Sequence, residues 1–187
     1  MRTFIALELS REVQEALART QQTLRTLVPR ARWTKPEGTH LTLKFLGEIT
    51  PHQVSPLQAA LDAVAARHQS FPLATAGGGA FPRLSAPRVL WLGLQPEERL
   101  MRLAREVEAA ISPLGFPSEV RPFQGHLTLA RLEGEPWPPD LRQRYLTLTG
   151  AMAGVSWMVD RVVLFRSELR PGGAIYSPVH FSVFDTP

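Results

Sequence analysis

The feature that most constrains the fold of this chain is an internal repeat. The tetrapeptide His-Leu-Thr-Leu occupies residues 40–43 and again residues 126–129, an interval of 86 residues. The apolar segments 5–9 and 90–94 recur at an interval of 85 residues, and a long amphipathic pattern follows each of them. Such a repeat predicts a duplicated unit of strands and helices.

Local signals divide this repeat into elements. Strands are predicted over residues 3–9, 40–46, 89–94, 126–129, 155–165 and 178–184, with extended segments at 31–34 and after Phe71 and a turn at 171–173. Helices are predicted over residues 11–28, 51–68, 96–114 and about 140–146. Ser10 is placed to cap the first helix, and Thr50, Pro51 and Gln53 form a capping-box pattern at the start of the second.

The composition excludes several functional classes. With 187 residues, of which 44% are hydrophobic and 20% charged, the chain can bury a core. It contains no apolar run long enough for a membrane span and no secretion signal, so we expect a soluble, cytoplasmic protein. The absence of cysteine excludes disulfides, cysteine nucleophiles and cysteine-ligated metal centres.

The positive charge is carried almost entirely by arginine. Only Lys35 and Lys44 among the 21 basic residues are lysines, which leaves 19 arginines against 17 acidic residues and a net charge of +4. Guanidinium groups match the geometry of phosphate oxygens, so this bias suits an anionic ligand. A GC-rich genome or a hot habitat would produce the same bias, and both interpretations stay open.

The two His-x-Thr motifs carry the candidate chemistry. On an ideal strand, alternation places His40, Thr42 and Lys44 on one face and the two leucines with Phe45 on the other. The second copy of the motif is arranged in the same way. We therefore expect the leucines to pack in the core and the polar faces to serve another purpose.

Two imidazoles on equivalent strands suit acid–base catalysis. Because the pKa of an unperturbed imidazole is about 6.5, His40 and His126 can supply one proton acceptor and one proton donor. The hydroxyls of Thr42 and Thr128 follow two residues later and suit the non-bridging oxygens of a phosphate. The pattern predicts phosphodiester chemistry without a metal. The alternative is that each motif only lines the polar side of a half-exposed strand.

Taken together, these residues resemble the 2H phosphoesterase superfamily, and specifically its bacterial and archaeal RNA 2′,3′-cyclic phosphodiesterases, historically called 2′-5′ RNA ligases. The resemblance rests on the segments at residues 4–7, 40–47, 81–91 and 126–131. It implies an α+β fold over residues 1–187, bilobal and duplicated, with two antiparallel sheets facing a central cleft and helices on the outside. The lobes are expected near residues 1–86 and 87–187, with strand exchange between them.

The same resemblance implies roles for individual residues. It makes His126 the proton acceptor and His40 the proton donor, although the near-symmetry of the motifs does not by itself orient a substrate. Arg131 and Phe45 each stand five residues after a motif histidine. The resemblance implies that Arg131 contacts the substrate phosphate or terminal nucleotide, and Phe45 offers a face for base stacking. Lys44 is a further candidate for holding the anion, or else an exposed lysine at a strand end.

The remaining candidates carry weaker signals. Arg166 and Ser167 are candidates for the rim of the cleft. The other histidines lack a threonine partner and are expected to be surface or structural residues: His52, His68 and His180. The tryptophans are expected to pack in the core or in loops: Trp33, Trp91, Trp137 and Trp157. The resemblance implies proline more often directly before the second motif, where this chain has Gly125.

The function implied by the resemblance is hydrolysis of an RNA 2′,3′-cyclic phosphate end to a 2′-phosphate, with 2′-5′ ligation as the reverse reaction. Its expected partners are RNA 3′ ends or small cyclic nucleotides, without a membrane, a cofactor or a metal, and the protein is expected to act as a monomer. A rival from another class is a non-catalytic protein that captures RNA ends or nucleotides.

Overall fold

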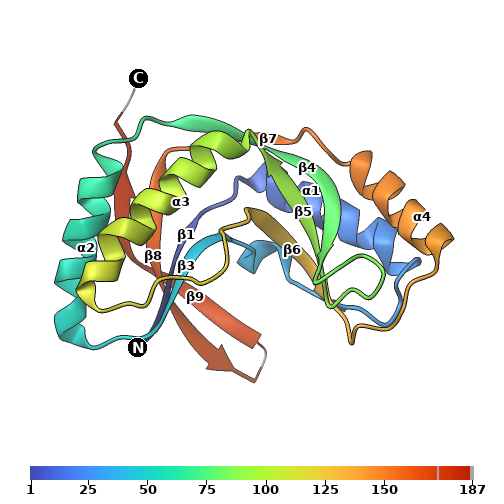
Figure 1. Ribbon diagram of the computed structural model, residues 1–187, viewed down its shortest axis with the longest axis horizontal. Coiled ribbons are helices and arrows are strands. Elements are labelled where there is room, and N and C mark those ends of the chain that lie inside the picture. The colour runs from blue at the N-terminus through green and yellow to red at the C-terminus, as the bar shows by residue number, and fades with distance from the viewer. Residues whose placement is uncertain (172, 186–187) are drawn as a thin grey trace.

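The computed structural model describes residues 1–171 and 173–185 and has an α+β architecture built on two antiparallel sheets (Figure 1). The strands are β1 (Arg2–Leu7), β2 (Arg32–Trp33), β3 (Leu41–Glu48), β4 (Phe71–Phe81), β5 (Val89–Gln95), β6 (His126–Arg131), β7 (Ser156–Val159), β8 (Arg161–Arg170) and β9 (Gly173–Val183). Sheet A has the strand order β3-β1-β8-β9, and sheet B has the order β2-β6-β5-β4-β7. The expected fold class, with its two antiparallel sheets, is confirmed.

The helices of the described chain cover the outer faces of the sheets. They are α1 (Arg11–Arg25), α2 (Pro51–Ala65), α3 (Glu97–Ile111) and α4 (Pro139–Gly150). Helices α2 and α3 pack against each other and against strands of sheet A, whereas α1 and α4 contact each other and strands β7 and β4 of sheet B. Figure 1 shows the two helix pairs on opposite sides of the molecule.

The hydrophobic residues form two clusters. The main core lies between helices and sheets and includes the motif leucines, as alternation predicts: Leu41, Leu43, Leu127 and Leu129. A smaller cluster consists of Phe4, Ala6, Val163 and Phe165. Since Ile5 and Leu164 belong to the main core, alternation places this second cluster on the other face of sheet A, away from α2 and α3.

The predicted helix starts are confirmed. The predicted ends of the first three helices extend too far, whereas α4 continues past the predicted residue 146 to Gly150. The hydroxyl of Ser10 accepts a hydrogen bond from the backbone of Val13, and Thr50 and Gln53 form the capping box. Helices α1 and α2 end before the predicted boundary, and α3 gives way to the 3-10 turn Ser112–Leu114. Apolar periodicity continues past the last α-helical turn because Val28 is still buried.

The single strand expected over residues 155–165 is wrong. The chain forms β7 in sheet B, passes Asp160, and then forms β8 in sheet A. The Asp160 carbonyl accepts a hydrogen bond from the backbone of Phe184 at 2.8 Å, and its carboxylate pairs with Arg161. An unbroken apolar run does not reveal a change of sheet, because both sheets bury the same residue types. Of the expected turn at 171–173, Gly172 lies outside the described residues.

The sheets do not coincide with the halves of the repeat. Sheet A takes β1 and β3 from the first half and β8 and β9 from the second, and sheet B likewise draws on both. The division into lobes near residues 1–86 and 87–187 stays a prediction. Within residues 1–171 and 173–185, no helix combines the length and the apolar composition that a membrane crossing requires.

Candidate active site

His126 opens strand β6, and its ring orientation is set by its own chain. The ring Nδ1 lies 2.7 Å from the carbonyl oxygen of Gln124. Because a carbonyl only accepts hydrogen bonds, Nδ1 carries a proton, and Nε2 of the neutral ring has a free lone pair. The ring meets Phe81 edge-on at a centroid distance of 4.9 Å and lies 6.3 Å from the ring of Trp91.

His40 stands directly before β3 and is held in a similar way. It hydrogen-bonds the backbone of Gly38, again two residues upstream. Its ring centroid lies 4.4 Å from that of Phe165, 5.3 Å from Tyr176 and 5.9 Å from Phe4. The imidazole of His40 therefore packs against Phe4 and Phe165 of the smaller cluster, on the face of sheet A opposite to α2 and α3.

Burial lowers the pKa of both histidines below the ordinary value of 6.5. The backbone hydrogen bonds to Gly38 and Gln124 act in the opposite direction. The positive charge of Arg131 lowers the pKa of His126 further. Both rings are therefore largely neutral near pH 7, and each retains one nitrogen suited to proton transfer.

Strand β3 contains an extra residue three positions after its histidine. In the ladder between β1 and β3, Ala6 pairs with Thr42 and Ile5 pairs with Lys44, which leaves Leu43 without a partner residue. A bulge of this kind shifts the alternation of side chains by one position beyond it.

Strand β6 contains the same bulge at the equivalent motif position. In the ladder between β5 and β6, Trp91 pairs with Thr128 and Leu90 pairs with Ala130, so that Leu129 is the extra residue. Both Leu129 and Ala130 are buried, and the next side chain, that of Arg131, is exposed. The residue five positions after each motif histidine therefore returns to the face of that histidine.

This bulge overturns two expectations from ideal alternation. Lys44 does not share the face of His40: only 2% of it is exposed, and its Nζ donates to both carboxylate oxygens of Glu108 and to the carbonyl of Pro117, each at 2.8 Å. It is neither an exposed strand end nor placed to hold an anion beside His40. Phe45 does not pack with the core leucines. It is 65% exposed, and its ring centroid lies 6.1 Å from that of Phe4.

Thr42 and Thr128 are half-buried, and neither hydroxyl has a hydrogen-bond partner within the described part of the chain. The carbonyl of Thr128, by contrast, accepts a hydrogen bond from the hydroxyl of Thr34 at 2.9 Å. Free hydroxyls beside the two imidazoles are suited to donate to an anionic ligand.

The segment that leads into His40 is fastened to the strand that carries His126. The backbone of Thr34 donates to the carbonyl of Leu129 at 3.0 Å, and the buried amide of Gln21 donates to the carbonyl oxygens of both. From Thr34, one 3-10 turn at Pro36–Gly38 leads to His40. The structure thus joins the two motifs through β2 and this short connection.

The structure also places the candidates with weaker sequence signals, namely the two residues proposed for the cleft rim, the other histidines and the tryptophans. Arg166 pairs with Glu168, and Ser167 faces Tyr176 across the β8–β9 ladder. Of the other histidines, His52 is exposed, whereas His180 hydrogen-bonds Asp62. His68 is buried between α2 and β4. Trp137 and Trp157 are buried, as expected.

Sequence reasoning missed the aromatic surroundings of both histidines. Phe4, Phe165 and Tyr176 surround His40, and Phe81 and Trp91 surround the second histidine. Alternation along β1 places Phe4 on the other face from the core residue Ile5, so the sequence did contain a signal for an aromatic residue on that face. The contribution of Tyr176 depends on the pairing of β9 with β8 and had no local signal.

Close packing explains why residue 125 is a glycine. A Cβ atom at this position would lie 2.5 Å from Cδ2 of Leu100 on α3. The loop before the second motif is therefore pressed against α3 at this point. Among residues 1–171 and 173–185, no three histidine, aspartate or glutamate side chains gather as a metal site would require.

Comparison with known proteins gives a consistent result. The model of the family described as LigT like Phosphoesterase matches twice, at residues 7–91 and 92–176. The RNA 2′,3′-cyclic phosphodiesterase of Geobacillus stearothermophilus is 36% identical over 89% of this chain, which spans about half of that relative, 52%. The enzyme of the same name from Methanothermobacter thermautotrophicus is 31% identical, with 95% of both chains covered.

Solved structures share the whole fold. A protein of Thermus thermophilus superimposes with a TM-score of 0.80 at 30% identity, covering 98% of both chains. E. coli LigT in complex with 3′-AMP superimposes with a TM-score of 0.75 at 26% identity, covering 98% of this chain and 97% of LigT.

Proposed function

Because the chain belongs to the LigT-like phosphoesterase family, we propose that it hydrolyses the 2′,3′-cyclic phosphate at RNA 3′ ends by two-histidine acid–base catalysis, without a metal. The observation that carries this proposal is the matched setting of His40 and His126. Each is held by a backbone hydrogen bond two residues upstream and half-buried against aromatic rings. The relatives that bear the name RNA 2′,3′-cyclic phosphodiesterase support the substrate class.

In this mechanism the two imidazoles have opposite tasks. Neutral His126 takes a proton from water through Nε2 as the water oxygen attacks phosphorus in line with the bond to the ribose 3′-oxygen. That bond breaks, and protonated His40 donates its proton to the departing 3′-oxygen. The products are a 2′-phosphate and a free 3′-hydroxyl, and the two histidines exchange protonation states.

The neighbouring groups stabilise the charge and position the nucleotide. The free hydroxyls of Thr42 and Thr128 donate to the non-bridging phosphate oxygens, and the guanidinium of Arg131 neutralises the developing charge. The exposed ring of Phe45 offers a stacking face for the terminal base. We expect the protein to act on RNA 3′ ends or small cyclic nucleotides as a monomer.

Removing either histidine tests the proposal. His40→Ala and His126→Ala should each lower kcat on a 2′,3′-cyclic nucleotide by about 10²–10⁴-fold, with unchanged circular dichroism. The exposed His52 is the matched control, and His52→Ala should keep wild-type turnover. Near wild-type turnover in either motif variant would refute two-histidine catalysis. A wild-type protein that binds the cyclic nucleotide without turnover would support the rival, a non-catalytic binder.

The identity of the product tests which histidine is the acid. With His40 as the proton donor, a 2′,3′-cyclic end opens to a 2′-phosphate, which phosphorus NMR distinguishes from the 3′-isomer. A predominant 3′-phosphate would mean that the two roles are reversed. By microscopic reversibility the same site joins a cyclic end to a 5′-hydroxyl. An RNA carrying a 5′-hydroxyl in large excess should therefore yield a 2′-5′ linkage.

Metal independence is tested by chelation. Turnover by the purified protein should be unchanged after incubation with excess EDTA and removal of the chelator, because proton transfer and charge stabilisation come from side chains. Loss of activity that a divalent cation restores would assign the chemistry to a metal instead.

A further inference from the structure

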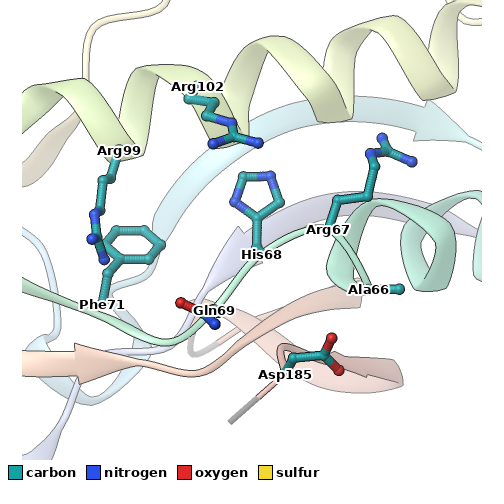
Figure 2. Close-up of a pocket in the computed structure, with 8 residues that line it drawn as sticks. All are labelled: Ala66, Arg67, His68, Gln69, Phe71, Arg99, Arg102 and Asp185. Carbon is teal, nitrogen blue, oxygen red and sulfur yellow. The ribbon is translucent and has the colours of Figure 1, made fainter. Parts of the chain in front are cut away.

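A second candidate site lies on the helical side of sheet A. A cavity of about 360 Å³ opens beside the end of α2, the start of α3 and the start of β4. Figure 2 shows its lining, which includes Arg67, His68, Arg99, Arg102 and Asp185. Helices α2 and α3 lie against one face of sheet A, whereas His40 rests on the opposite face, so the cavity is separate from the histidine site.

The charge around this cavity is positive. Arg67 and Arg102 each donate through Nε to the carboxylate of Glu106, at 3.2 and 2.9 Å. Arg99 has no ion pair or hydrogen bond within residues 1–171 and 173–185. The cavity lining thus contributes three guanidinium groups and the carboxylate of Asp185, with the carboxylate of Glu106 paired to Arg67 and Arg102. Within residues 1–171 and 173–185, the η nitrogens of Arg99 and Arg102 make no hydrogen bond.

His68 adds a buried polar atom that lacks a hydrogen bond. Its side chain is 6% exposed, and Nε2 makes no aligned hydrogen bond within residues 1–171 and 173–185, although Oε2 of Glu106 lies 3.3 Å away. The contact is therefore within ion-pair range without the alignment of a hydrogen bond. Figure 2 shows the ring lying beneath Arg102, between that side chain and Gln69. A buried nitrogen whose contact with a carboxylate is poorly aligned is incompletely satisfied, and a bound acceptor would supply an aligned hydrogen bond.

We propose that this cavity binds a terminal phosphate group. Guanidinium groups bind phosphate oxygens through paired hydrogen bonds, and Nε2 of His68 can donate a further one. A volume of about 360 Å³ lies at the small end of ligand sites and suits inorganic phosphate or a phosphomonoester. The proposal is independent of the chemistry proposed for His40 and His126.

The binding experiment uses a protein whose histidine site is disabled. In the double variant His40→Ala/His126→Ala, calorimetric titration with inorganic phosphate should still show one bound ion per chain. Adding Arg99→Gln should weaken this binding about tenfold or more, as expected for the loss of a charge-assisted hydrogen bond. Arg99 takes part in no ion pair of the described chain, so this substitution removes no such contact.

The matched control is Arg105→Gln. Arg105 is an exposed arginine on the same helix that does not line the cavity, so phosphate affinity should stay within about twofold of the parent. Glu106→Gln should instead tighten binding, since it frees Arg67 and Arg102 from their carboxylate. No phosphate binding by the double variant, or equal losses in Arg99→Gln and Arg105→Gln, would overturn the proposal.

Two further titrations distinguish the sources of the phosphate. Adenosine 5′-monophosphate tests a phosphomonoester, and an RNA oligonucleotide without terminal phosphates tests the phosphodiester backbone. Binding of inorganic phosphate or of the monophosphate that depends on Arg99 supports a terminal phosphate. Arg99-dependent binding of the unphosphorylated RNA alone would refute a terminal-phosphate site and indicate a groove for the RNA backbone.

Discussion

At the scale of single residues, the burial of the two imidazoles sets the pH dependence of catalysis. The base must be neutral and the acid protonated, so kcat/KM should follow a bell-shaped profile whose limbs report these two groups. Because burial lowers the pKa of both His40 and His126 from 6.5, the maximum should lie below pH 6.5. Initial rates on a 2′,3′-cyclic nucleotide between pH 4.5 and 8.5 measure it. A profile without a maximum in this range would contradict the assignment.

Arg131 acts on the same profile through its charge. Arg131→Gln should lower kcat/KM by about tenfold to a hundredfold through loss of a charge-assisted hydrogen bond to phosphate. Because the guanidinium lowers the pKa of His126, its removal should also move the acid limb of the profile to higher pH. The exposed Arg19 on α1 supplies the control, and Arg19→Gln should change neither quantity. An unshifted acid limb would show that Arg131 does not act on the base.

At the scale of elements, the bulge in β3 turns Lys44 inward and creates a buried ion pair with α3. The Lys44 side chain is 1% exposed, whereas that of Glu108 is 28% exposed. Glu108→Gln leaves a buried ammonium without its carboxylate and should cost about 3–5 kcal/mol of unfolding free energy. In Lys44→Met the methionine fills the space and Glu108 can be hydrated, so the cost should be about 1.5–3 kcal/mol.

Chemical denaturation of both variants and of the double variant measures this asymmetry. Because the two groups are in contact, the double variant should lose less stability than the sum of the single variants. A larger loss for Lys44→Met than for Glu108→Gln would show that packing of the lysine stem, and not its charge, dominates.

At the scale of the whole molecule, buried neutral histidines make the fold sensitive to mild acid. Burial is the largest cause of the lowered pKa of His40, His68 and His126. As the pH falls, these histidines therefore take up protons near pH 6.5 in the unfolded chain but only at lower pH in the folded chain. This contribution to stability is present above pH 6.5 and is lost as the pH falls through the lowered pKa values.

We therefore expect the free energy of unfolding to fall between pH 7 and pH 5, before the carboxylates begin to titrate. Guanidinium denaturation at several pH values checks this. His68→Gln should make the free energy of unfolding depend less steeply on pH, and it leaves His40 and His126 unchanged. A free energy of unfolding that stays constant over this window would contradict it.

The sequence by itself determined the pair of His-x-Thr motifs and most elements of the duplicated unit, the strand expected over residues 155–165 excepted. Period-two and helical patterns depend on local geometry, so the motif leucines were correctly assigned to the core and both capped helix starts were placed. The resemblance carried by those motifs predicted the α+β fold of two antiparallel sheets. Only the tertiary structure decided which sheet each strand joins and which face each side chain takes after the bulges. Lys44 and Phe45 therefore lie opposite to where alternation placed them, because the bulge at Leu43 is defined by the pairing of β3 with β1 and shifts the alternation of every residue beyond it.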